Sequence, residues 1–270
     1  MRQHTVREAR SSNANPIRIT DEFAVQTSKQ YTATLLCKDC EQRLRKYGED
    51  WVLAHCWRGE TFALASLVFS AKPKFSSPEA SLYYAAEIDG INASAMTYFA
   101  ASMFWRAAVH NWSNRSSEPA INLGPYREQL RQYLVGAAEF PKNCMLSVVL
   151  PPANGRMVRY MMHPFPKRTR GCTVYTLLFL GIQFSIFVGR QIQQNWREMD
   201  FARGPGNPIG ISARFDEMFA RDLVLLFGRH KRALAMLDEI EDRCDPDARN
   251  LKLAELLPRM IPITRANRKR

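Results

Sequence analysis

The stretch TVYTLLFLGIQFSIFV, residues 173–188, decides between a membrane helix and a β-hairpin, and with that choice the fold class. It is the one long apolar run of the chain, yet it is shorter than the roughly 20 residues that a bilayer requires. Gly181 interrupts it, and Gln183 and Ser185 alternate with apolar neighbours. These features predict two buried strands of a hairpin and no membrane partner.

The segments around this hairpin extend the β pattern. Runs of β-branched and aromatic residues alternate with the turn-forming sequences PPANG and PFPKRTRG. The spacing predicts an antiparallel meander of four strands within residues 141–210, with PFPKRTRG as a hairpin loop. The four predicted strands are residues 144–150, 156–163, 172–180 and 182–189.

Helical periods flank the predicted sheet. Residues 41–57 predict one helix that either runs through Gly48 or breaks there. Residues 91–112 and 123–138 predict two further helices, and helices are expected to resume from Ser212. The predicted order along the chain is helices, an antiparallel sheet and then helices again. This order predicts the α+β class.

We expect residues 31–264 to form one compact unit with a basic extension at each end. Residues 1–30 carry several arginines and the tract SSNANP, and predict a basic, loosely ordered arm. Within this unit, residues 31–140 are predicted to hold a strand, the cysteine knuckle and helices. Residues 141–210 are predicted to form the antiparallel sheet, and residues 211–264 the C-terminal helices. A basic tail follows at 265–270.

Composition limits the choice of partner. The chain has 270 residues, 46% of them hydrophobic, with 38 Lys and Arg against 26 Asp and Glu, a formal net charge of +12. Such a charge attracts nucleic acid, an anionic membrane or an acidic protein, and nucleic acid is the leading interpretation. The alternative is a solvated basic surface that only maintains solubility.

The start MRQHTVREAR has no apolar export signal, which predicts a cytoplasmic, reducing location without disulfides.

The stretch LLCKDCEQRLRKYGEDW, residues 35–51, holds two cysteines at the spacing of a metal knuckle. Cys37 and Cys40 can bind one structural zinc ion, which requires four ligands in total. His55 and Cys56 can join them only if the chain turns back, because a continuous helix would carry them roughly 20 Å away. His4 can join if the N-terminal arm folds over the pair.

Two other interpretations of the cysteine pair remain open. Both residues can be reduced thiols without a ligand. A redox role is less favoured, because the chain lacks the βαβ pattern of thioredoxin-like proteins. The carboxylates of Asp39 and Glu41 are also expected to raise the thiol pKa.

The segment LLCKDCEQRLRKYGEDWVLAHC resembles the second knuckle of bacterial HNH-endonuclease-like proteins, with Cys-x-x-Cys-Glu, a following helix and then a Gly-Glu pair. FAASMFWRAA, residues 99–108, is similar to that group's helix with a Trp-Arg pair, and GNPI, residues 206–209, to a later part. The resemblance implies nucleic-acid binding, a role in phage defence or a mobile element and, in active members, a divalent metal for endonuclease chemistry.

The chain departs from the active pattern of that group. Glu41 stands where many members have histidine, so that His4 is the remaining candidate for the general base and Cys37 and Cys40 would be structural metal ligands. The resemblance therefore implies a nucleic-acid-binding protein whose nuclease centre is degenerate. The competing interpretation is a non-catalytic scaffold or effector that binds a protein partner, with incidental positive charge.

Two groups of cations are candidates for phosphate contacts. Arg43 and Lys46 follow the knuckle on its helix, and PFPKRTRG adds Lys167, Arg168 and Arg170. Phosphate binding by Arg106 and His110 is less favoured than packing of Arg106 on neighbouring aromatic rings. The chain shows neither a glycine-rich phosphate loop nor a Gly-x-Ser-x-Gly elbow.

Overall fold

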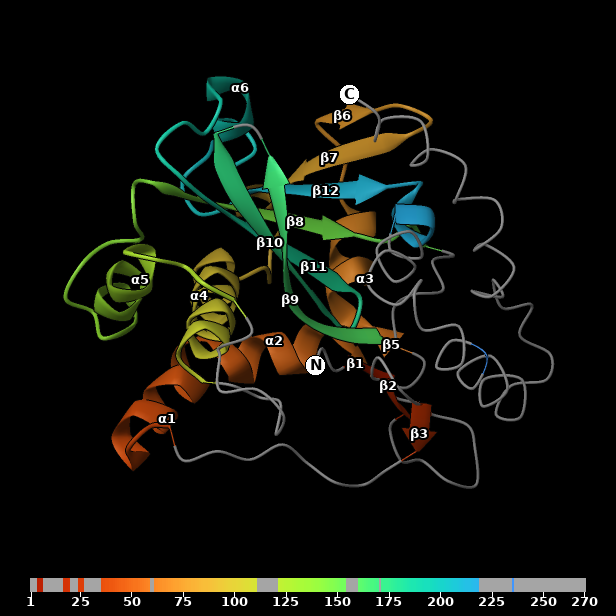
Figure 1. The fold of residues 1–270 in the computed structure, drawn as a ribbon. Helices are drawn as coiled ribbons and strands as arrows, with labels where there is room; N and C mark the ends of the chain where they lie inside the picture. The colour runs from red at the N-terminus through yellow and green to blue at the C-terminus, as the bar shows by residue number, and fades with distance from the viewer. Residues whose placement is uncertain are drawn as a thin grey trace, which may run out of the picture.

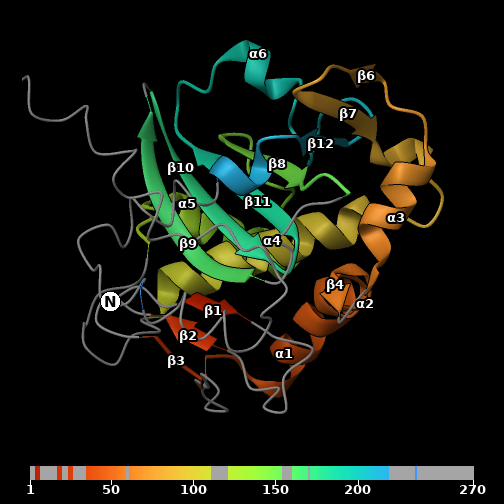
Figure 2. The same ribbon diagram turned by 90° about the vertical axis from the view of Figure 1, so that its right-hand side faces the viewer.

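The computed structural model describes residues 4–6, 17–19, 24–26, 35–58, 61–110, 121–153, 160–169, 171–218 and 235. In this part of the chain, helices pack on a large mixed sheet, which confirms the α+β class (Figures 1 and 2). The strands are β1 (His4–Val6), β2 (Ile17–Ile19), β3 (Ala24–Gln26), β4 (Trp57–Arg58), β5 (Thr61–Phe62), β6 (Phe75–Ser76), β7 (Ala80–Tyr84), β8 (Cys144–Leu150), β9 (Tyr160–Thr169), β10 (Cys172–Phe179), β11 (Ile182–Val188) and β12 (Pro208–Ser212). The helices are α1 (Lys38–Leu44), the π-helical turn η1 (Arg45–Glu49), α2 (Asp50–His55), α3 (Ala63–Ser70), the 3-10 turn η2 (Ala85–Glu87), α4 (Ala93–Val109), α5 (Tyr126–Leu134) and α6 (Gln194–Arg197).

The stretch that decides the fold forms the hairpin β10–β11. The strands pair antiparallel from Thr173 with Val188 to Phe179 with Ile182, as predicted. Gly181 has a φ of +89°, and a Cβ there would lie 2.7 Å from the ring of Phe62. Glycine therefore allows both the tight turn and the close approach of the β5 aromatic ring. None of the helices in the described ranges is long and apolar enough to cross a bilayer.

The sheet order differs from the predicted meander. Among the described residues the order is β3-β2-β1-β9-β10-β11-β8-β12-β7-β6. Strands β9, β10 and β11 are consecutive neighbours, but β8 pairs with β11 and lies parallel to β12. The four predicted strands do pair antiparallel with one another, but their order as a meander was wrong because the prediction placed β8 beside its sequence neighbour β9. The alternation that marks a strand does not identify its partner.

The sequence PFPKRTRG was predicted as a hairpin loop, yet residues 164–169 belong to strand β9. The register with β10 shifts between Thr176 and Leu178, so that His163 and Pro164 together face the single residue Leu177. Such a bulge lets a strand accept proline, which lacks a backbone N–H. The turn to β10 comes only after Thr169.

The N-terminal arm was predicted to be loosely ordered, but its described residues are strands. β1 pairs antiparallel with β9, His4 opposite Met162, and β2 and β3 follow outward. Without β1, the outer N–H and C=O groups along part of β9 would form an open sheet edge. Pairing of these groups is the physical reason that residues 4–6 form a strand, and the rest of the predicted arm, apart from β2 and β3, lies outside the described residues.

The knuckle helix, which we define as α1, η1 and α2, is continuous through Gly48. A π-helical turn at Arg45–Glu49 replaces the break that was one of the two predicted alternatives. A Cβ on Gly48 would lie 2.8 Å from the backbone N of Phe99 in α4. The missing side chain therefore lets the two helices meet at backbone distance.

Helix α4 links the knuckle helix to the sheet. Predicted within residues 91–112, it occupies Ala93–Val109 and begins at Asn92, whose side chain accepts a hydrogen bond from the N–H of Ala95 at 2.9 Å. The Phe99 ring lies 4.9 Å from that of Phe179 and 5.8 Å from that of Phe184. The side chain of Phe99 thus contacts the sheet while its backbone contacts Gly48, so the core fixes the position of the knuckle helix. Figure 2 shows α4 beside the strands of the sheet.

The C-terminal part was predicted to turn helical from Ser212. Ser212 instead ends β12, which pairs with β7, and the chain becomes helical three residues later, at residues 215–218. Except for residue 235, the predicted helices beyond residue 218 lie outside the described residues, as does the basic tail. A strand was predicted to lead into the cysteine knuckle, but the described residues directly before α1, 35–37, are irregular.

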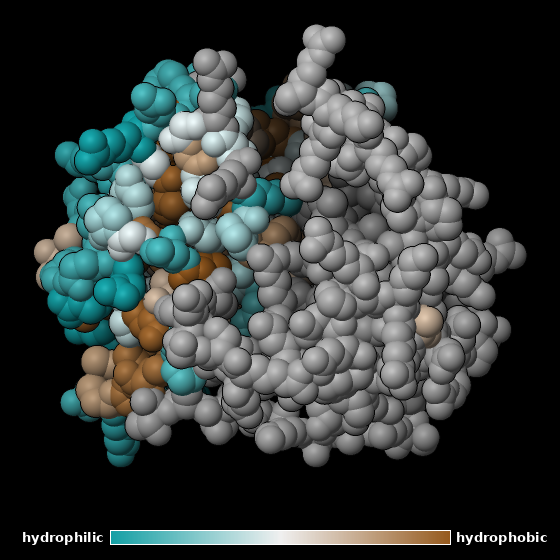
Figure 3. Space-filling view, in the orientation of Figure 1, coloured by the Kyte–Doolittle hydropathy of each residue, from teal (hydrophilic) through white to brown (hydrophobic). Residues whose placement is uncertain are grey.

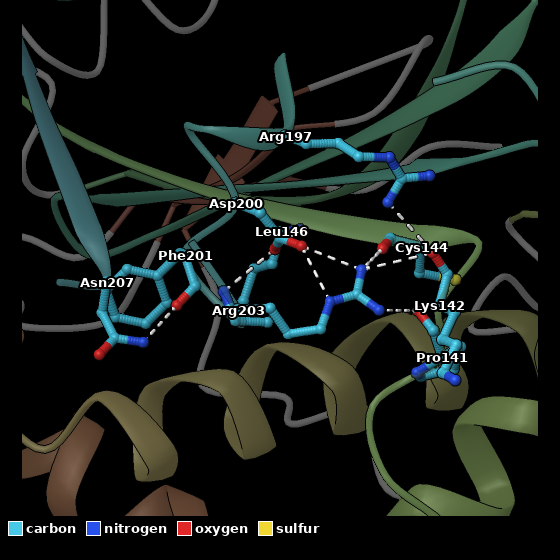
Figure 4. A network of polar contacts seen from close by, with 10 residues as sticks. Pro141, Lys142, Cys144, Leu146, Arg197, Asp200, Phe201, Arg203 and Asn207 are labelled. Atoms are coloured by element: carbon cyan, nitrogen blue, oxygen red, sulfur yellow. Dashed lines mark hydrogen bonds and ion pairs between the residues drawn. The ribbon is translucent and has the colours of Figure 1, made fainter. Parts of the chain in front are cut away.

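A polar network fixes the segment between α6 and β12 to the start of β8 (Figure 4). Asp200, only 2% exposed, accepts hydrogen bonds from the N–H groups of Leu146 and Ala202, both at 3.1 Å. Its other carboxylate oxygen pairs with Arg203 at 2.9 Å. Arg203 also donates to the carbonyls of Pro141, at 3.0 Å, and Cys144. We call Asp200 and Arg203 the clasp.

Strand β9 contains a histidine whose protonation is expected to destabilise the fold. Burial lowers the pKa of His163 to about 4, below its usual value of about 6.5. The folded state therefore holds the neutral ring, and the unfolded state binds the proton more tightly. Stability is expected to fall as the pH drops from about 6.5 towards 4. Because the side chain is partly accessible, the loss should stay below about 3 kcal/mol.

Urea unfolding at about pH 7 and about pH 4.5 measures this loss. The variant His163→Gln, which cannot titrate in this range, is expected to lose less stability than the wild type between the two pH values. Equal losses in both proteins would contradict the assignment to His163.

Candidate functional site

The cysteine knuckle lies at the start of α1. Cys37 is the residue before the first helical turn and is exposed, whereas Cys40 is half-buried. The pKa of Cys37 is lowered, mainly by the backbone N–H and the thiol of Cys40, which stabilise a Cys37 thiolate. The pKa of Cys40 is raised, chiefly by the same contact between the two side chains.

The expectation that nearby carboxylates raise the pKa of both thiols was wrong for Cys37. Asp39 does act in that direction, but the contacts with Cys40 are the larger effect. The two thiols thus differ in exposure and in acidity, with the more acidic one at the surface.

The other proposed metal ligands do not come near the pair. The continuous knuckle helix ends at His55, whose ring stacks on Trp51 with centroids 4.0 Å apart, and the thiol of the buried Cys56 donates to the carbonyl of Leu53 at 3.5 Å. His4 is on β1, which Figure 1 places away from the start of α1. Within the described ranges, no group of three or more His, Cys, Asp or Glu side chains is arranged to hold a metal ion. A structural zinc site requires four ligands, and among the described residues only Cys37 and Cys40 remain as candidates for one.

One face of the knuckle helix combines two cations with an exposed aromatic ring. Tyr47 is 50% exposed, and the Arg43 guanidinium and the Lys46 ammonium each lie 5.7 Å from its ring centroid. Both cations are exposed. We call Arg43, Lys46 and Tyr47 the cation–tyrosine face.

Packing against α4 and α5 holds this face in place. The ring of Tyr98 in α4 lies 5.7 Å from that of Tyr47 and 5.8 Å from that of Tyr133 in α5. The Tyr98 hydroxyl donates to the carbonyl of Leu134 at 2.6 Å. A series of rings thus supports Tyr47 from the inside and leaves its outer part accessible.

Other residues of the knuckle helix line a pocket of about 680 Å³. Glu49 and Arg106, from η1 and α4, form a half-buried ion pair there, and Arg106 also donates to the Ser102 hydroxyl at 3.1 Å. Apolar and polar surface meet in the region of α1 (Figure 3). The lining residues are Leu35, Leu36, Lys38, Glu41, Gln42, Leu44, Arg45, Glu49 and Arg106.

The second predicted group of cations lies elsewhere. Lys167 is exposed on β9, with its ammonium 5.6 Å from the centroid of the Phe165 ring. The end of β9 that carries it lies at the opposite end of the molecule from α1 (Figures 1 and 2). The side chain of Arg168 and all of Arg170 lie outside the described residues. The structure therefore does not bring Lys167 together with Arg43 and Lys46.

Sequence reasoning missed two features of this site. Tyr47 lies within the helical period of residues 41–57 and was not singled out as a site residue, although its spacing of four from Arg43 could have indicated a cation–π pair. Arg106 was expected to pack on aromatic neighbours, but it pairs with Glu49, 57 residues away. The pocket is thus lined by Glu41, Glu49 and Arg106 together. These residues belong to the Cys-x-x-Cys-Glu, Gly-Glu and Trp-Arg patterns that carry the resemblance to HNH-like proteins.

No family model, curated protein or solved structure matches this chain. The relationship to HNH-like proteins therefore stays a prediction.

Proposed function

We propose that this protein binds single-stranded nucleic acid through the cation–tyrosine face. The observation that carries the proposal is the half-exposed Tyr47 ring with Arg43 and Lys46 beside it on one helix. Proteins that bind single strands combine cations for the phosphates with aromatic rings on which bases stack. The face offers both at one place.

The surrounding charges support this assignment. The acidic residues that follow Tyr47 are engaged by other cations, Glu49 by Arg106 and Asp50 by Arg45 at 2.9 Å. The formal net charge of +12 adds a long-range attraction for a polyanion. Because stacking is possible with every base, we expect weak sequence preference.

The proposal concerns binding and not cleavage. In the predicted nuclease arrangement His4 would act beside the cysteine knuckle. β1, which carries His4, lies away from the start of α1 (Figure 1). This separation supports the degenerate nuclease centre that the resemblance implied.

Replacing Tyr47 with alanine is expected to weaken binding of a labelled single-stranded oligonucleotide by about tenfold to a hundredfold, because one stacked base contributes about 1–3 kcal/mol. Fluorescence anisotropy measures the affinity. Tyr47→Phe keeps the ring and should stay within about twofold of the wild type.

Both variants should retain the wild-type circular dichroism spectrum, since half of the ring is outside the core. Equal affinity of the wild type and Tyr47→Ala would remove Tyr47 from the proposed interface.

A further inference from the structure

The pocket of about 680 Å³ beside the knuckle helix has a size at which proteins hold ligands as large as a nucleotide. Its lining comes from the knuckle helix, from the two leucines that precede this helix and from Arg106 of α4. Arg43, Lys46 and Tyr47 are not among the lining residues. The pocket is therefore separate from the cation–tyrosine face and can hold a ligand of its own.

Three leucines make part of the pocket apolar. Leu35 and Leu36 are half-buried, and Leu44 is 5% exposed. Proteins that take up a single base hold its flat faces between apolar or aromatic side chains. The leucines can contact a planar ring system in this way and remove it from water.

The cations that line the pocket outnumber the carboxylates. Glu49 and Arg106 neutralise one another as an ion pair. Lys38 is exposed, and Arg45 uses its Nε–H for the hydrogen bond to Asp50 at 2.9 Å, which is one of the five N–H donors of a guanidinium. Lys38 and Arg45 can therefore bind a phosphate group on a ligand.

Glu41 is the other carboxylate of the pocket. Within the part of the chain that the structure describes, no hydrogen bond or ion pair engages its side chain. A carboxylate presents two acceptor oxygens and no donor. Guanine is the base whose Watson–Crick edge has two neighbouring donors, N1–H and N2–H, whereas the other bases place an acceptor beside each donor. Of the nucleic-acid bases, guanine is therefore the one that this carboxylate fits.

We propose that this pocket binds a guanine nucleotide. Glu41 accepts hydrogen bonds from N1–H and N2–H of the base, the leucines contact the faces of the base, and Lys38 and Arg45 bind the phosphate. The nucleotide can be a free molecule or part of the single strand proposed for the cation–tyrosine face, since the recognised groups are the same. The proposal does not depend on binding at that face, because a free nucleotide needs only the pocket.

Isothermal titration calorimetry of the full-length protein with guanosine, inosine and adenosine monophosphate (GMP, IMP and AMP) tests the proposal. GMP is expected to bind at least about tenfold more tightly than IMP, which lacks only the N2 amino group. The same preference is expected over AMP, which presents an acceptor to the carboxylate. Guanosine should bind more weakly than GMP because it lacks the phosphate.

Two variants separate recognition of the base from recognition of the phosphate. Glu41→Gln is expected to bind GMP about tenfold more weakly and to lose most of the preference for GMP over IMP, because one acceptor becomes a donor. Lys38→Gln should bind GMP about fivefold more weakly and guanosine as the wild type does. Glu79→Gln, the matched control at an exposed glutamate outside the pocket, should bind GMP like the wild type. All three positions are exposed, so the circular dichroism spectra should not change.

Three results would overturn the proposal: no binding of GMP at millimolar concentration, equal affinities for GMP and AMP, or unchanged affinity for GMP in Glu41→Gln. Tyr47→Ala should bind GMP like the wild type. Failure at the pocket and failure at the cation–tyrosine face are therefore distinguishable.

Competition with labelled single strands identifies the source of the nucleotide. If GMP displaces a guanine-containing oligonucleotide but not oligothymidine, the pocket holds a guanine of the bound strand. If GMP binds and displaces neither, the ligand is a free nucleotide. Displacement of both strands would place GMP at the cation–tyrosine face and contradict the assignment to the pocket.

Discussion

Replacing Asp200 with alanine is expected to lower the free energy of unfolding by about 3–5 kcal/mol. The substitution removes the acceptor for the N–H groups of Leu146 and Ala202. It also leaves the guanidinium of Arg203, which is 31% exposed, without its carboxylate partner. A buried charge whose partner is removed costs more than the pair contributed, because its desolvation is no longer compensated.

Urea unfolding of Asp200→Ala measures this loss, with Asp50→Ala as the matched control. Asp50 also pairs with an arginine, but the side chains of Asp50 and Arg45 are 57% and 72% exposed. The control should therefore lose about 1 kcal/mol or less. If both variants lose the same stability, the clasp does not hold β8 to the segment before β12.

Local patterns were sufficient for the elements at the centre of the fold. The alternation around Gly181 predicted the hairpin β10–β11, and the spacing of apolar residues predicted α4. In both, the determining contacts lie within a few residues along the chain, so that periodicity and turn residues carry the information.

Contacts between distant segments could not be predicted in the same way. The pairing of β8 with β11 and that of β1 with β9 depend on which strand edges remain open once the hairpin has formed. The proline-containing end of β9 became a strand because a bulge at His163 and Pro164 accommodates it. These outcomes depend on the assembled sheet and not on local propensity.

In the candidate site, too, local features could be predicted from the sequence and features that depend on tertiary contacts could not. The spacing of Cys37 and Cys40, and the cations that follow them, were evident from the sequence. Their environment was not, because the acidity of Cys37 depends on the fold of the first helical turn and Glu49 meets Arg106 only through tertiary packing. Helical periodicity likewise could not show that the Tyr47 ring is half exposed.

Reversing both charges of the cation–tyrosine face, Arg43→Glu with Lys46→Glu, is expected to reduce affinity for single-stranded nucleic acid on the order of 100-fold at low salt. Two phosphate contacts are lost and two repulsive charges are added beside the strand. Both side chains are exposed, so the fold should persist. The matched control Lys72→Glu with Lys74→Glu makes the same change of charge at two exposed lysines between α3 and β7 and should lose far less.

The dependence of affinity on salt, compared between the wild type and the Arg43→Glu, Lys46→Glu variant, tests the account most directly. Each phosphate contact to a single strand contributes about −0.7 to the slope of log K against log salt, so the variant's slope should be shallower by about 1.4. The Lys72→Glu, Lys74→Glu control should keep the wild-type slope. Equal slopes for the wild type and the Arg43→Glu, Lys46→Glu variant, or the larger change in the control, would contradict nucleic-acid binding at the cation–tyrosine face.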